Sequence, residues 1–199
     1  MLDLAVLGLL KERAMHGYEL RKQLTQRMGF FWTVSFGSLY PTLRKLERRG
    51  LVAKARPDDD AGHGRRKQVY RITPAGEREF IALLEGPGAN DEDKFTLRLA
   101  FFRYLRPETR LRLLERRKAY LQDRLEEGRR TLASAQRRQA DGYTLSLMRH
   151  GVEVTERDVE WLDELIAAER GPAGGPPQAD PPVEQDADHE HADEVRTIT

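Results

Sequence analysis

Apolar residues recur three and four positions apart in three successive stretches of the first 50 residues. This spacing lies on one face of a helix, so it predicts three amphipathic helices. The first begins near Leu2, the second follows a break at residues 16–17, and the third runs from about Ser38 to Arg49. Its cap is expected to be Ser38, with Ser35 as an earlier alternative. The apolar positions are Leu2, Ala5, Val6, Leu9 and Leu10, then Tyr18, Leu20, Leu24 and Met28, then Leu39, Leu43 and Leu46.

Two short strands are predicted next, at Leu51–Arg56 and Lys67–Thr73. The segment between them, PDDDAGHGRR, is rich in proline, aspartate and glycine, so the two strands are expected to form a hairpin. A fourth helix follows, capped by Thr73, and it ends near Leu84. The breaker sequence GPG at 86–88 then marks a boundary between two domains.

The second half of the chain is predicted to be entirely helical. Residues 93–105 indicate one helix, a second extends from Pro107 to about Ala140, and a last one covers roughly 144–169. In the long helix, eight positions from 111 to 135 alternate three and four residues apart, as in a coiled-coil seam. Five of these positions are leucine, and Lys118 and Gly128 weaken the seam. This seam packs either on the last helix of the same chain or on a second copy, and we favour a mixture in which the last helix crosses to the other subunit. The residues predicted for dimerisation are Leu111, Leu114, Leu121, Leu125, Leu132, Trp161 and Leu165.

These elements predict a mainly α fold in three parts. Residues 1–85 would form a winged helix-turn-helix with a two-stranded wing, and residues 90–170 an all-helical dimerisation domain. Residues 171–199 are rich in proline, glycine and acidic side chains, and are expected to be a disordered tail.

Composition excludes several classes of function. The chain has no cysteine, which removes disulfides and thiolate metal sites and fits a cytoplasmic location. It has no apolar run long enough for a membrane span, and its start lacks the features of a signal peptide. The usual nucleotide-binding, metalloprotease and serine-hydrolase motifs are missing, so we expect no enzyme, no cofactor and no metal site.

Charge is distributed unevenly along the chain. Residues 1–85 carry 16 Lys and Arg against 10 Asp and Glu, whereas residues 171–199 carry one Arg against seven acidic residues. The net charge of +1 hides this difference. A basic first domain is a candidate for binding a polyanion such as nucleic acid.

The third helix carries the strongest functional signal. Its three leucines share one face. The opposite face carries Ser38, Pro41, Arg44, Lys45 and Arg48, with Tyr40 and Thr42 at its margins. Small polar residues followed by basic residues are typical of a helix that lies in the major groove of DNA. An ordinary solvated basic face is the alternative. The tip of the hairpin, with Arg65, Arg66 and Lys67, favours DNA because a basic wing reaches phosphate, although Asp58–Asp60 in the same loop oppose this.

Four ordered motifs resemble the PadR family of bacterial regulators: LAVLGLL at 4–10, HGYEL at 16–20, GSLYPTLRKLERRGLV at 37–52 and RRKQVYRITPAGE at 65–77. The helical remainder resembles the branch of that family with the longer C-terminal domain. The resemblance implies a homodimeric, sequence-specific regulator, usually a repressor, on a near-palindromic operator of double-stranded DNA. It assigns DNA contact to Tyr18, Ser38, Tyr40, Pro41, Arg44, Lys45 and the wing bases, and Thr42 joins them by its position. Half-buried packing is an equal alternative for Tyr18.

Members of the family often sense a small aromatic effector. Such a ligand has candidate lining residues here, but plain core packing also explains them, so no ligand site is assigned. These residues are Phe95, Phe101, Phe102, Tyr104 and Trp161. The alternative function is a winged-helix interaction protein that binds a protein partner or coats DNA nonspecifically. A large preference for one sequence would distinguish an operator binder from such a protein.

Overall fold

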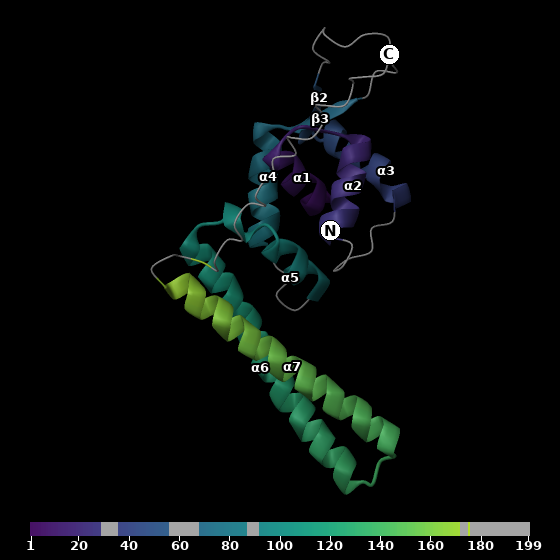
Figure 1. The fold of residues 1–199 in the computed structure, drawn as a ribbon, viewed down its shortest axis with the longest axis vertical. Coiled ribbons are helices and arrows are strands. Elements are labelled where there is room, and N and C mark those ends of the chain that lie inside the picture. Colours follow the sequence, from purple (N-terminus) through teal and green to yellow (C-terminus); the bar gives the residue numbers. More distant parts are fainter. Residues whose placement is uncertain (29–35, 56–67, 87–91, 172–174, 176–199) are drawn as a thin grey trace, which may run out of the picture.

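The computed structural model describes residues 1–28, 36–55, 68–86, 92–171 and 175. Figure 1 shows a head built from the N-terminal helices and a small sheet, from which two long helices extend as an antiparallel pair. The elements are α1 (Leu2–Glu12), β1 (Met15–His16), α2 (Gly17–Met28), the 3-10 turn η1 (Phe36–Ser38), α3 (Leu39–Arg48), β2 (Val52–Ala55), β3 (Val69–Ile72), α4 (Pro74–Glu85), α5 (Glu92–Leu99), the 3-10 turn η2 (Phe102–Tyr104), α6 (Pro107–Arg137) and α7 (Gly142–Arg170).

Helix α1 forms the centre of the head. Every residue from Leu4 to Leu10 is buried, although the sequence predicts an amphipathic helix. The reason is that α2, α3, α4 and β3 all pack against it. Gly8 lets a further group approach, because a Cβ built on it would lie 2.4 Å from the ring of Phe101.

The sheet has three strands: β2 and β3, the two strands predicted for the wing, and the short strand β1, which was not predicted. The strand order is β1-β3-β2, and both pairings are antiparallel. Tyr70 of β3 lies opposite Met15 on one side and Lys54 on the other. Strand β1 has two residues, too short for a hydrophobic pattern to reveal it. The loop predicted to join the hairpin lies outside the described residues.

The expected cap of α4 is present, whereas that of α3 is not. Thr73 Oγ1 accepts a hydrogen bond from Gly76 N at 3.0 Å and donates one to Gly50 O at 2.7 Å. Gly50 has a φ of +69° and ends α3 in the left-handed conformation that glycine tolerates. Ser38 occupies the N-cap position of α3 but makes no side-chain capping bond, because the turn η1 precedes the helix.

The predicted helix over 93–105 ends earlier than expected. Helix α5 stops at Leu99, and the chain continues through η2 to Leu105. Burial explains the break, because the Phe101 ring packs edge-on against Phe80 of α4, with a centroid distance of 5.6 Å. Tyr104 meets the same phenylalanine at 5.6 Å. Tertiary packing of these rings therefore overrides the helical periodicity.

Ionic contacts join the same turn to the head. Glu12, at the end of α1, accepts hydrogen bonds from Arg27 of α2 at 2.6 Å and from Arg103 of η2. The hydrophobic core runs without interruption from the head into residues 95–105. Residues 95–105, which follow the predicted boundary at 86–88, are thus packed on the winged part of the chain.

Helices α6 and α7 form the long hairpin (Figure 1). Arg110 and Glu169 pair at 2.9 Å with side chains only 14% and 5% exposed, and Arg129 pairs with Glu156 at 2.6 Å. Asp141 caps α7, and its hydrogen bonds from the Thr144 hydroxyl and backbone N–H hold the pKa of this carboxyl below its usual value. Among the described residues, no helix combines the length and apolar run that crossing a bilayer requires.

Candidate nucleic-acid interface

Helix α3 has the two faces that the sequence predicts. Leu39, Leu43 and Leu46 are at most 1% exposed and pack in the core. The opposite side presents polar and basic side chains to solvent. Ser38, Tyr40, Pro41, Arg44 and Lys45 are exposed, and Thr42 is half-buried.

The start of α2 lies directly beside α3. A Cβ built on Gly17 would be 3.1 Å from the Tyr40 ring, so the glycine lets the ring lie over the helix start. Tyr18, the next residue, is 72% exposed. Half-buried packing therefore does not explain Tyr18, and its ring and hydroxyl are accessible together with Tyr40, which is 51% exposed.

The sheet borders the same flank of α3 as Tyr40. Lys54 of β2 pairs with Glu47 of α3 at 3.0 Å. Burial raises the pKa of Tyr70 on β3, whereas the positive charges of Lys54 and Arg44 lower it. Arg65, Arg66 and Lys67, predicted at the wing tip, lie outside the described residues. Strands β2 and β3 of the hairpin thus lie on the Arg44 side of α3.

The other flank of α3 is held by acidic side chains of the framework. The Lys45 ammonium lies 2.6 Å from Asp3 Oδ2 of α1, and Arg49 pairs with Glu79 of α4 at 2.7 Å. Three of the basic residues in and directly after α3 therefore fall into two groups. Arg44 faces the side of α2 and the sheet, whereas Lys45 and Arg49 contact carboxylates on the side of α1 and α4.

A further ion pair stabilises the entrance to α2. Arg13 donates a hydrogen bond to Glu19, which holds the pKa of that carboxyl below its usual value. Glu19 lies in the first turn of α2, where a negative charge also interacts favourably with the helix dipole. This pair joins Arg13, which follows α1, to the first turn of α2 beside Tyr18.

The leucine seam of α6 is used largely within the chain. Leu114, Leu121 and Leu125 are buried, and Leu111 and Leu132 are half-buried. On α7, Leu165 is half-buried and Trp161 is 42% exposed. Packing of α6 on α7 therefore accounts for much of the seam that a second copy was also predicted to cover.

A different apolar surface remains open on α7. Tyr143, Leu147, Val154 and Trp161 are 92%, 72%, 37% and 42% exposed. Their spacing of four, seven and seven residues places them along one stripe of the helix. We call these four residues the α7 stripe. Tyr143 was not predicted, because the expected last helix began near residue 144, although the spacing of four to Leu147 is visible in the sequence.

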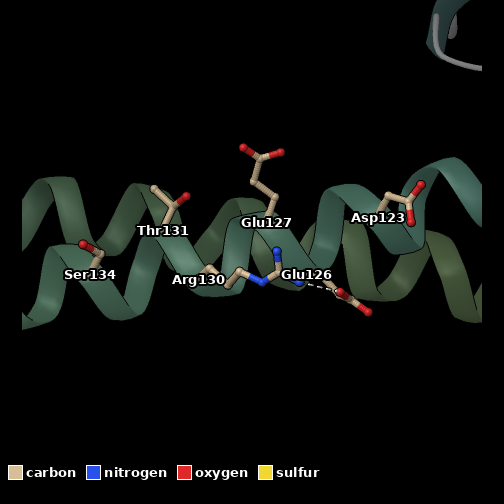
Figure 2. A pocket seen from close by; sticks show the side chains of 6 residues that line it. All are labelled: Asp123, Glu126, Glu127, Arg130, Thr131 and Ser134. Atoms are coloured by element: carbon tan, nitrogen blue, oxygen red, sulfur yellow. Dashed lines mark hydrogen bonds and ion pairs between the residues drawn. The ribbon is translucent and has the colours of Figure 1, made fainter.

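Two hollows lie on the α6–α7 hairpin, and neither is lined by an aromatic side chain. One, of about 630 Å³, follows the outer face of α6; Figure 2 shows its polar side chains, including Asp123 and Glu127, projecting from the helix. The other, of about 310 Å³, lies between α6 and α7 near Gly128 and Val152. Phe95, Phe101 and Phe102, which were candidates to line an effector site, are buried in packing. Among the described residues, no group of three His, Asp or Glu side chains could hold a metal ion.

Comparisons with known proteins identify two families along the chain. Residues 6–82 match the "Transcriptional regulator PadR-like family", and residues 93–169 match "Virulence activator alpha C-term". The negative transcriptional regulator PadR of Bacillus subtilis is 26% identical over 178 residues, which cover 84% of this chain and 96% of the relative. A transcriptional regulator of Mycobacterium tuberculosis is 41% identical over 81 residues, covering 41% of this chain and 67% of the relative.

Solved structures of Bacillus subtilis PadR are also similar. The complex with operator DNA is 21% identical, with a TM-score of 0.40, and the match covers 83% of this chain and 97% of that chain. The complex with p-coumaric acid is 22% identical, with a TM-score of 0.38, over 83% and 96% of the two chains. The prediction that the chain is no enzyme agrees with the relatives, which are transcriptional regulators.

Proposed function

Because the chain belongs to the PadR-like family of transcriptional regulators, we propose that it is a repressor that binds a near-palindromic operator as a homodimer. The observation that most supports this is α3, whose leucine face is buried while its basic face stays open beside Tyr18 and the sheet. Such a function requires access to chromosomal DNA, so we assign it to the bacterial cytoplasm.

In this proposal the exposed side of α3 enters the major groove and its flanks meet phosphates. Arg44 is the principal candidate for a base contact, because arginine can donate two parallel hydrogen bonds to a guanine edge. Tyr18 and Tyr40 reach the backbone through their hydroxyls. The full set of proposed contacts is Tyr18, Ser38, Tyr40, Pro41, Thr42, Arg44 and Lys45, with Arg65, Arg66 and Lys67 of the wing.

Selection of bound sequences from random duplex DNA by the full-length protein tests this function. A twofold-symmetric motif, bound on the order of 10³ times more tightly than random duplex, is the result expected of a dimeric operator binder. Salt-sensitive binding without any enriched motif would contradict the proposal. That result would favour the alternative, a winged-helix protein that coats DNA or meets a protein partner.

The dimer is proposed to form through the α7 stripe. A monomer would leave a row of large apolar side chains in water along most of the helix. A second copy related by a twofold axis can bury the same stripe on both chains, since such an interface is self-complementary. The proposed dimer residues therefore include Tyr143, Leu147 and Val154 as well as Trp161. The α6 leucines pack against α7 within the same chain.

Leu147→Glu is expected to weaken the dimer by more than about tenfold. Leu147 is 72% exposed, so the change leaves the packing within one chain nearly intact. In the dimer it removes a buried leucine, which contributes roughly 1.5–3 kcal/mol per subunit, and introduces a charge. Sedimentation equilibrium over a range of protein concentrations measures the effect. Ser146→Glu adds the same charge one residue away and off the stripe; equal dissociation of the two variants would contradict this interface.

Release by a small aromatic effector is the remaining part of the proposal. The first compound to test is p-coumaric acid, which is bound in a crystal structure of Bacillus subtilis PadR. If it is an effector, titration should weaken operator binding by about fivefold or more, the range of a typical allosteric coupling. A saturated acid of similar size is the control. Unchanged operator affinity at saturating p-coumaric acid would remove this compound from the proposal.

A further inference from the structure

One carboxylate of the framework neutralises part of the basic face of α3. Asp3 lies in the first turn of α1, and its Oδ2 is 2.6 Å from the Lys45 ammonium and 4.0 Å from the Arg49 guanidinium. The Asp3 side chain is 22% exposed and that of Lys45 is 51% exposed. The contact is therefore open to solvent on one side, where another anion can compete for the lysine.

The position of Lys45 makes DNA phosphate that competing anion. On the helical wheel Lys45 lies at the rim of the exposed face, between its centre and the flank that contacts α1. With this face in a groove, a phosphate strand passes along the rim. An exposed ion pair of this kind contributes at most about 1 kcal/mol, but Lys45 can meet a phosphate only by giving up this pair.

We propose that Asp3 is a specificity-determining residue that limits sequence-independent DNA binding by withholding Lys45 from phosphate. This inference rests on the proposed function of α3. Binding to random duplex depends on phosphate contacts alone, so one withheld cation weakens it directly. On the operator, base contacts made from the Arg44 side hold the helix in place. The one withheld phosphate contact therefore lowers affinity for the operator by a smaller factor than affinity for random duplex. Asp3 thereby widens the difference between operator and random DNA.

The test is Asp3→Asn in the full-length protein, assayed by fluorescence anisotropy against a random duplex and the selected operator over a series of salt concentrations. Freeing Lys45 adds one phosphate contact, so the slope of log K against log salt should steepen by close to 0.9. Affinity for random duplex should rise about fivefold to tenfold near 0.1 M salt. The rise for the operator should be smaller, so the specificity ratio falls.

Two further variants separate this effect from a general change of charge. Glu77→Gln makes the same charge change at the pair with Lys11, on the α1–α4 side of the head, and should leave both slopes as in the wild type. Lys45→Gln combined with Asp3→Asn should abolish the whole gain in slope and affinity, because the lysine that makes the added phosphate contact is then missing.

Each other outcome overturns the inference. It fails if Asp3→Asn keeps the wild-type slope, if Glu77→Gln gives the same gain, or if the gain persists without Lys45. A wild-type protein that binds no duplex at all would overturn the proposed function together with this inference. A wild type that binds its operator while all variants behave alike would overturn the role of Asp3 only. Thermal unfolding of each variant checks that the fold is retained.

Discussion

Gly76→Ala is expected to destabilise the protein by about 3 kcal/mol, because the first turn of α4 has no room for a side chain. A Cβ built on Gly76 lies 2.1 Å from the carbonyl oxygen of Leu51 and 2.8 Å from Ile72 Cγ1. The carbonyl cannot simply retreat, since it accepts a hydrogen bond from Thr73 N at 3.1 Å. The alanine must therefore displace α4, β2 or both. Urea unfolding followed by circular dichroism measures the loss.

Gly151→Ala is the matched control for this prediction. Gly151 lies in the exposed middle of α7, and a Cβ built on it meets no atom within 4 Å. Alanine should stabilise the helix there by roughly 0.5–1 kcal/mol, since glycine loses more conformational freedom on folding. If the free energy of unfolding of Gly76→Ala lies within about 0.5 kcal/mol of the wild-type value, α4 does not approach Leu51 this closely.

Arg44→Ala is expected to weaken operator binding by about 1–3 kcal/mol and to relax the preference for one base pair in each half-site. Arg44 is exposed on the side of α3 that faces α2 and the sheet, where Tyr18 and Tyr40 are also open to solvent. A lost base contact reduces affinity for the operator but leaves random duplex nearly unchanged. Competition binding with operators varied one position at a time measures both effects.

Arg112→Ala, on the exposed side of α6, is the control for loss of one positive charge away from the head. It should change neither affinity nor base preference. Lys45→Ala should cost less than Arg44→Ala, because a DNA contact by Lys45 replaces its existing pair with Asp3. If Arg44→Ala keeps the wild-type preference at every position of the half-site, base contact by Arg44 is contradicted.

Local chemistry made much of the fold accessible from the sequence. The two faces of α3 follow from leucines at helical spacing, and the start of α4 follows from Thr73, whose hydroxyl caps Gly76 as expected. The motifs around residues 4–20 and 37–52 also indicated the family, since each consists of neighbouring residues. Strand β1 was missed because two residues carry no periodicity, and η2 because the rings of Phe101 and Tyr104 keep helical spacing.

For this protein the sequence by itself determined which helix presents basic side chains to solvent, because amphipathic spacing acts over a few residues. Only the tertiary structure decided which of those basic side chains pair with carboxylates and which stay open. Lys45 meets a carboxylate 42 residues away, whereas Arg44 stays open beside the sheet. It likewise decided that α7 covers Leu114 and Leu121 while leaving Leu147 and Trp161 exposed. Contacts between residues so far apart depend on how the helices pack, and no local pattern specifies them.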